Sequence, residues 1–160
     1  MEWSSSWVIG AVTLGVAALF GAMIWRPLRN WRYAREARRA LQAFKLQREM
    51  LEAKFFDLAA SQGKPRGLRW TECHWQSAVT FARDRQSGLL TAFAAVQISF
   101  EAIEGGDMEG VEAVDAMRYA AAVFHYQRGR WGTGGRALFN LNPQDALVRL
   151  ENQFEPVALP

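Results

Sequence analysis

The sequence predicts an α+β protein: an N-terminal transmembrane helix and a long helical stalk precede an antiparallel β-meander of about five strands with a C-terminal helix. Three observations carry this prediction. An uncharged apolar run fills residues 8–24, a proline-free stretch of helix formers follows, and alternating apolar residues appear after Gly67. We divide the 160 residues into a short tail (1–6), a transmembrane helix (7–25), a basic juxtamembrane segment and stalk (26–63), a soluble domain (64–155) and a tail (156–160).

The apolar run is long enough to cross a membrane as one helix. Val8–Ile24 holds 17 residues without a charge, and as a helix the run with its flanking tryptophans spans roughly 28 Å, close to a hydrocarbon core of about 30 Å. Tryptophan favours the headgroup level of a bilayer. We therefore expect Trp7, Trp25 and Trp31 to anchor the helix at the two interfaces.

Two other interpretations of this run agree less well with the residues around it. A cleaved signal peptide needs a basic leader and a small-residue cleavage site, whereas residues 1–6 carry no Lys or Arg and the run ends at Ile24–Trp25. A buried helix of a soluble domain would show a polar face, but only Thr13 interrupts the run. The sequence therefore favours a membrane anchor.

The basic residues on one flank predict the orientation of the anchor. Six arginines follow the run, and none precedes it: Arg26, Arg29, Arg32, Arg35, Arg38 and Arg39. Because Lys and Arg stay on the cytoplasmic side, we expect the N-terminus outside and the remaining domain in the cytoplasm, at a bacterial inner membrane. The arginines would then contact anionic lipid headgroups, each contributing up to about 1 kcal/mol. The alternative is that they only set the topology.

The rest of the chain carries little net charge. From Lys64 onward there are ten basic and eleven acidic residues, so the positive balance belongs to the membrane boundary, and we do not expect nucleic acid as a partner. Cys73 is the only cysteine, so no intramolecular disulfide can form, which is compatible with a cytoplasmic domain. The glycine-rich stretch 132–136 lacks the Lys-Ser/Thr of a phosphate loop and indicates a bulge or a close backbone approach.

The stalk has an apolar stripe with two interpretations. Its members recur on a seven-residue pattern: Leu41, Phe44, Leu51, Phe55 and Leu58. Arg48 occupies one stripe position, which weakens a coiled-coil seam. Self-association through the stalk or the membrane helix and docking of residues 44–58 on the following domain remain equal alternatives. We expect Gly63 to cap the helix and Pro65 to end it.

The domain begins with strand signals and ends with a helix signal. Residues 90–102 alternate as a half-buried strand, and glycines at Gly88 and Gly129 predict hairpin turns. Asn142 and Pro143 fit the first positions of a helix that covers the apolar face of the sheet. By architectural analogy, we expect a curved sheet wrapped on a helix, broadly like cystatin or nuclear-transport-factor-like folds.

Three stretches resemble segments of uncharacterised membrane-anchored proteins of planctomycete bacteria. They are KPRGLRW (64–70), FEAIEGGDMEGVEAV (100–114) and GRALFNLNP (135–143), and the resemblance covers residues 64–151. It implies a source and a membrane anchor. It implies no activity and no site residues.

No residue pattern predicts a catalytic centre, a cofactor or a metal site. Cys73 and His74 are neighbours in a predicted strand, so they point to opposite faces and cannot share a metal or form a nucleophile–base pair. The acids of residues 101–115 lack the spacing of a calcium loop, so a solvated loop or a surface for a basic partner fits better than an ion site. If the sheet encloses a pocket, the candidate lining residues are Arg118, His125 and Arg136.

Two functions follow from this pattern. The first is a non-catalytic single-pass membrane protein that presents a small cytoplasmic domain to an unknown protein partner or helps to assemble a complex. The second is a membrane-tethered domain that binds a small ligand inside a curved sheet, with weak enzymatic activity as an extension. A filled core favours the first function, and an enclosed polar cavity favours the second.

Overall fold

A computed structural model describes residues 3–62, 65–111 and 116–157 of the chain, and for residues 3–27, 29 and 30 it describes the backbone alone. The chain forms two compact units, residues 1–39 and residues 40–160. The second unit contains all the strands and begins within the segment predicted as a stalk. The predicted cap at Gly63 lies outside the described residues.

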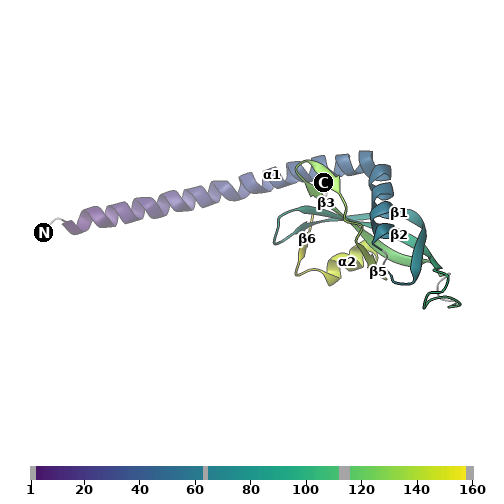
Figure 1. The fold of residues 1–160 in the computed structure, drawn as a ribbon. Coiled ribbons are helices and arrows are strands. Elements are labelled where there is room, and N and C mark those ends of the chain that lie inside the picture. The colour runs from purple at the N-terminus through teal and green to yellow at the C-terminus, as the bar shows by residue number, and fades with distance from the viewer. Residues whose placement is uncertain (1–2, 63–64, 112–115, 158–160) are drawn as a thin grey trace. The chain divides into compact units, whose positions relative to one another are not determined.

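The described part of the chain is α+β, as predicted, with two helices and six strands (Figure 1). The elements follow in this order: α1 (Trp3–Ser61), β1 (Leu68–Asp84), β2 (Leu90–Ala102), β3 (Arg118–Gln127), β4 (Arg130–Gly132), β5 (Ala137–Phe139), α2 (Pro143–Arg149) and β6 (Phe154–Pro156). The sheet is antiparallel with the order β4-β3-β2-β1-β6, and β5 pairs with the other end of β3.

Both predicted hairpins are present. Between β1 and β2, the Asp84 carboxylate accepts hydrogen bonds from the backbone N–H groups of Gln86 and Ser87, and Gly88 has a φ of 71°. These bonds lower the pKa of Asp84, the Ser87 bond most, so their stabilising effect is present at neutral pH and is lost as pH falls through that lowered pKa. Arg128 and Gly129 both adopt positive φ between β3 and β4, as a two-residue hairpin turn requires.

One face of the sheet is covered by residues 40–61 of α1. Phe44 packs edge-on against Phe81, Phe124 and Trp131 at ring-centroid distances of 5.1–5.6 Å. Phe55, fully buried, lies 5.4 Å from Trp75 and 5.9 Å from Phe124. Of the two alternatives for residues 44–58, the structure therefore shows the docking of this segment on the following domain.

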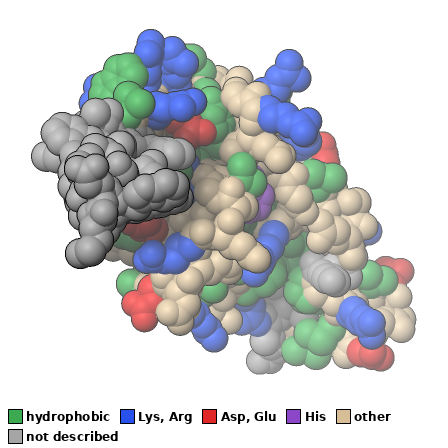
Figure 2. All heavy atoms as spheres, turned by 90° about the vertical axis from the view of Figure 1, so that its left-hand side faces the viewer, with side chains coloured by type: hydrophobic (Ala, Val, Ile, Leu, Met, Phe, Trp, Pro, Cys, Tyr) green, Lys and Arg blue, Asp and Glu red, His purple; other side chains and the backbone are tan. Residues whose placement is uncertain are grey.

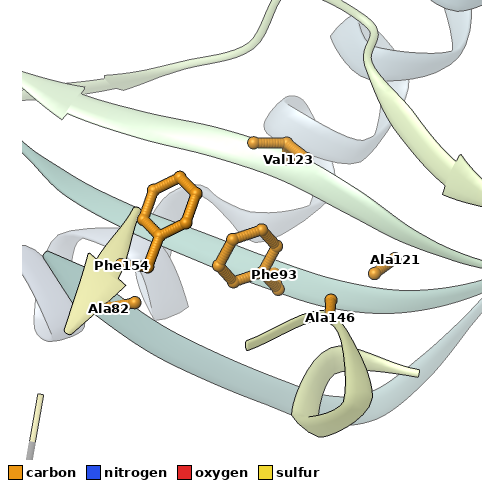
Figure 3. Close-up of a cluster of buried hydrophobic side chains, with 6 residues drawn as sticks. All are labelled: Ala82, Phe93, Ala121, Val123, Ala146 and Phe154. Atoms are coloured by element: carbon orange, nitrogen blue, oxygen red, sulfur yellow. The ribbon is translucent and has the colours of Figure 1, made fainter. Parts of the chain in front are cut away.

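The opposite face of the sheet carries a second core beneath α2 (Figure 3). The Phe93 and Phe154 rings meet edge to face at 5.2 Å, and Ala146 of α2 packs into the same cluster. α2 starts as predicted, with Asn142 as its cap: the Asn142 side chain accepts a hydrogen bond from the Asp145 backbone N–H at 2.8 Å.

The structure corrects three details of the predicted sheet. It has six strands in place of about five, because a short strand, β6, follows α2 and pairs with β1. The β2 strand is buried on both faces between Leu90 and Val96, since α1 and α2 lie on different sides of it. The strand expected after the hairpin turn at Gly129 is split into β4 and β5. The split allows Gly135 to approach α1: a Cβ at this glycine would lie 2.6 Å from the Ala59 backbone nitrogen.

The predicted membrane segment lies mostly outside the described side chains. Within the part of the chain that the structure describes, no helix is long and apolar enough to cross a membrane. The side chains of the predicted span 7–25, including Trp7 and Trp25, and those of Arg26 and Arg29 lie outside the described part of the chain.

Replacing Phe55 with alanine tests whether the α1 contact stabilises the domain. Because Phe55 is fully buried between the helix and three aromatic rings, we expect Phe55→Ala to lower the free energy of unfolding by about 3–5 kcal/mol in urea denaturation. Leu46→Ala on the same helix is the matched control, since Leu46 is 87% exposed, and its effect should stay within about 0.5 kcal/mol. Equal effects of the two changes would contradict docking.

Candidate functional site

A surface groove runs between α1 and the outer edge of β1, and we call it the α1–β1 groove. It has a volume of about 420 Å³. The helix and the strand each contribute to its lining: Glu52, Ala53, Phe56 and Asp57 from α1, and Thr71, Glu72, Cys73, His74 and Trp75 from β1. The groove therefore combines aromatic side chains of both elements with the Glu52 and Asp57 carboxylates of α1.

The edge of β1 that borders the groove has unpaired backbone. On its outer side, β1 pairs with β6 only at Ala82–Asp84, and the Val157 N–H donates to the Phe81 carbonyl at 3.1 Å. In the described part of the chain, no strand pairs with the outer edge before Phe81. The backbone groups of residues 71–75 on this side are thus accessible to another extended chain.

Two bulges define the regular part of this edge. The β1–β2 register shifts between Trp70 and Glu72 and again between Trp75 and Val79. Between the shifts, residues Glu72 to Trp75 pair without interruption with Ser99 to Val96. Bulges commonly protect sheet edges, so they leave here only a short straight stretch beside the groove.

Arg48 connects α1 to the second bulge. Its guanidinium donates to the Gln76 backbone carbonyl and also pairs with Glu52 at 2.6 Å. An arginine in the apolar stripe of a helix is unexpected for a coiled coil, but here it satisfies a carbonyl that the bulge removes from the sheet ladder. Arg48 therefore fixes the position of the strand edge relative to the helix.

The groove lacks an activated nucleophile among its described residues. Burial raises the pKa of the Cys73 thiol to about 12, so the thiol stays protonated at neutral pH. His74 lies 3.2 Å from a Glu72 carboxylate oxygen, and the His74 side chain is more than half exposed. Among the residues that the structure describes, no group of three or more His, Cys, Asp or Glu side chains is arranged to hold a metal ion.

The three predicted pocket residues do not form one site. Arg118 lines a smaller hollow of about 210 Å³ at one end of the sheet, with Phe100, Phe139 and Asn140 among its neighbours. His125 is seven residues further along β3 and faces the side of the sheet that carries α2, where its Nδ1 lies 3.3 Å from Thr91 Oγ1. Seven residues of strand span about 23 Å, which separates His125 from Arg118.

Arg136 is close enough to His125 to affect it electrostatically. The pKa of His125 is lowered mainly because partial burial removes some of its hydration, and secondly because of the positive charge of Arg136. The negative charge of Asp84 raises this pKa by a smaller amount. His125 is therefore neutral at physiological pH. The His125 side chain keeps contact with solvent. Its contact with the fully buried Thr91 indicates a structural role for this histidine.

Four of the predicted lipid-contact arginines have described side chains, and all are exposed: Arg32, Arg35, Arg38 and Arg39. The Arg35 guanidinium lies over the Trp31 ring, 5.4 Å from its centroid, and Trp31 is itself 59% exposed. On the face shown in Figure 2, Lys and Arg side chains are distributed among apolar and neutral groups and form no single patch.

The predicted acidic segment 101–115 begins in β2 and continues into turns. Glu101, one residue before the end of β2, pairs with Arg69 at 2.6 Å, and Glu109 accepts a hydrogen bond from the Gly105 backbone N–H within the turns. Residues 112–115 lie outside the described part of the chain.

No protein family, no curated protein and no solved structure matches the chain. The resemblance to planctomycete membrane-anchored proteins and the analogy with cystatin-like sheets therefore stay predictions.

The sequence did not point to the α1–β1 groove. The structure places Trp75 half-buried against Phe55 and open to the groove. The spacing of Glu52, Phe56 and Asp57 puts them on one helix face, but only the docked position of α1 brings that face beside β1.

Removing the Arg48 guanidinium should destabilise the domain. We expect Arg48→Met to lower the free energy of unfolding by about 1–3 kcal/mol, because the Gln76 carbonyl loses its donor and Glu52 loses its partner. Lys45→Met, at an exposed position of the same helix, is the matched control and should change stability by less than about 0.5 kcal/mol in the same urea titration. If Arg48→Met behaves like the control, the bulge does not need this contact.

The protonated state of Cys73 can be measured by alkylation. At pH 8 we expect iodoacetamide to modify Cys73 at least about tenfold more slowly in the native protein than in urea, because burial raises its pKa from 9.0 to about 12 and so depletes the reactive thiolate. The rate should rise with pH up to the raised pKa. Equal native and denatured rates at pH 8 would contradict the raised pKa of this thiol.

Proposed function

We propose that the protein is a non-catalytic single-pass membrane protein whose cytoplasmic α+β domain binds a protein partner or helps to assemble a complex. The observation that carries the domain's role is the unpaired edge of β1 beside the α1–β1 groove, because it offers backbone and side-chain contacts in one place. The anchor rests on the uncharged run 8–24 and its arginine-rich flank.

The described core supports protein binding over a ligand cavity in the sheet. Phe55 and Phe124 fill the α1 side, and Phe93 fills the α2 side, each almost completely buried. Arg118, His125 and Arg136 do not line a common cavity. The alternative of a small-ligand domain would use the hollow of about 210 Å³ that Arg118 lines.

The exposed residues before the domain support contact with a membrane surface. Leu28 and Trp31 are more than half exposed, and exposed arginines lie among the residues that follow Trp31. Tryptophan and arginine next to an apolar run are typical of the interface between hydrocarbon and anionic headgroups. The same arginines place the domain in the cytoplasm in this proposal.

Fusions and pull-downs test the two parts of the proposal. A C-terminal green fluorescent protein should fluoresce, a C-terminal alkaline phosphatase should stay inactive, and deletion of residues 1–25 should release the protein from the membrane fraction. From mild detergent, the tagged full chain should recover a partner that a truncated chain, residues 1–62, does not recover.

Two results would contradict this proposal. Active phosphatase without fluorescence would place the domain outside. Recovery of the same proteins by the full chain and by residues 1–62 would remove the role given to the sheet domain.

A further inference from the structure

We propose that the outer edge of β1 at Glu72–Trp75 binds an extended, Lys- or Arg-rich segment of the partner, which pairs with the edge as an added strand and lays basic side chains in the α1–β1 groove. This inference rests on the proposed function and names the chemistry of its partner. It uses the straight part of the edge, between the two register shifts.

The backbone of the edge selects an extended segment. An added strand needs a row of accessible N–H and C=O groups and a stretch of regular geometry. Residues 72–75 provide both, since their ladder with β2 is uninterrupted and no strand in the described part of the chain occupies their outer side. A helical segment could not satisfy these groups, because its own backbone is already hydrogen-bonded.

The side chains around the edge select basic residues. Cys73 and Trp75 face α1, so an added strand places every second side chain in the groove, beside Glu52 and Asp57 of the helix. The other side chains of the added strand lie next to Glu72 and His74 on the opposite face. Basic side chains on either face of the added strand would therefore meet a carboxylate. Glu52 already forms an ion pair with Arg48.

The groove also suits the aliphatic part of a Lys or Arg side chain. Phe56 and Trp75 are partly exposed and line the groove, while Asp57 is exposed beside them. A long basic side chain can pack its methylene groups or its cation on aromatic rings while its charged end reaches a carboxylate. A short acidic side chain would meet like charges at the same place.

A second copy of this chain fits the edge less well. Pairing two β1 edges would bring two acidic grooves together, with Glu52 and Asp57 from each copy, and would bring the Glu72 carboxylates together on the opposite face. The chain's own arginine-rich segment, residues 26–39, is part of α1 and is therefore helical rather than extended. These two points favour a different protein as the source of the basic strand.

Labelled peptides test the proposal on the full chain in dodecyl maltoside. Fluorescence anisotropy should show binding of Val-Lys-Val-Lys-Val-Lys, with affinity at least about tenfold above that of Val-Glu-Val-Glu-Val-Glu, because two or more charge contacts change sign. N-methylation of alternate peptide residues, tested in both registers, should weaken binding at least about tenfold in one register, since it removes main-chain donors.

A matched pair of variants locates the binding site. Asp57→Lys should weaken binding of the lysine peptide at least about threefold, whereas Asp107→Lys, which makes the same charge change at an exposed loop position away from the groove, should have a smaller effect. Circular dichroism confirms that both variants are folded.

Three peptide results would overturn the proposal: equal binding of the glutamate peptide, no effect of N-methylation in either register, or equal effects of the two variants. Dimers in sedimentation that Asp57→Lys dissociates would also overturn it, because a second copy would then occupy the edge. Failure here with a partner still recovered by the full chain would remove the basic strand but leave the proposed function. If the lysine peptide binds but the full chain recovers no partner, the edge of β1 still accepts a basic strand, and the proposed function is removed.

Discussion

The packing of Phe44 and Phe55 on the sheet is the contact on which the other features of the domain depend. Both rings meet Phe124 of β3, and between them they contact aromatic residues of β1 and β4. With the helix held there, the Trp131 indole N–H reaches the Ala40 carbonyl at 2.7 Å, and Gly135 approaches the backbone at Ala59. The α1–β1 groove exists because this helix lies beside the edge of β1.

Small residues on the strands make this packing possible. On the α1 side, β2 and β3 present four almost completely buried alanines: Ala92, Ala94, Ala120 and Ala122. Short side chains let the helix approach the sheet closely, and the large rings of Phe44 and Phe55 fill the remaining space. The same close packing leaves little room for a ligand between helix and sheet, so binding surfaces are expected at the edges of the domain.

Local signals predicted the local structure well. The hairpin glycines, the Asn142 cap and the long β2 strand follow from backbone chemistry that acts over a few residues. The burial of both β2 faces did not follow, because an alternating pattern of Ala, Thr and Ser cannot show whether a second helix covers the polar side. The docking of residues 44–58 stayed one of two alternatives, because an apolar stripe does not identify the surface that covers it.

The site required contacts between distant parts of the chain. In the sequence, Arg48 interrupts the apolar stripe of a possible coiled coil. The structure gives the reason for a charged residue at this position: its guanidinium donates to the Gln76 carbonyl at a β-bulge. Arg118 and His125 are polar residues suited to bind a ligand, and that property predicted them as pocket residues. In the structure, β3 holds the two on opposite faces of the sheet. Strand bulges and the placement of an unpaired edge depend on the whole sheet, so residue patterns alone could not predict the groove.

Hydrogen exchange of the backbone amides tests the central claim most directly, namely that residues 40–61 belong to the folded domain and do not form an independent stalk. If the claim holds, amides in residues 44–58 exchange through the same global opening as those of β2 and β3, with the same free energy and the same dependence on denaturant. Exchange of the helix at a clearly lower free energy, while β2 and β3 stay protected, would contradict it.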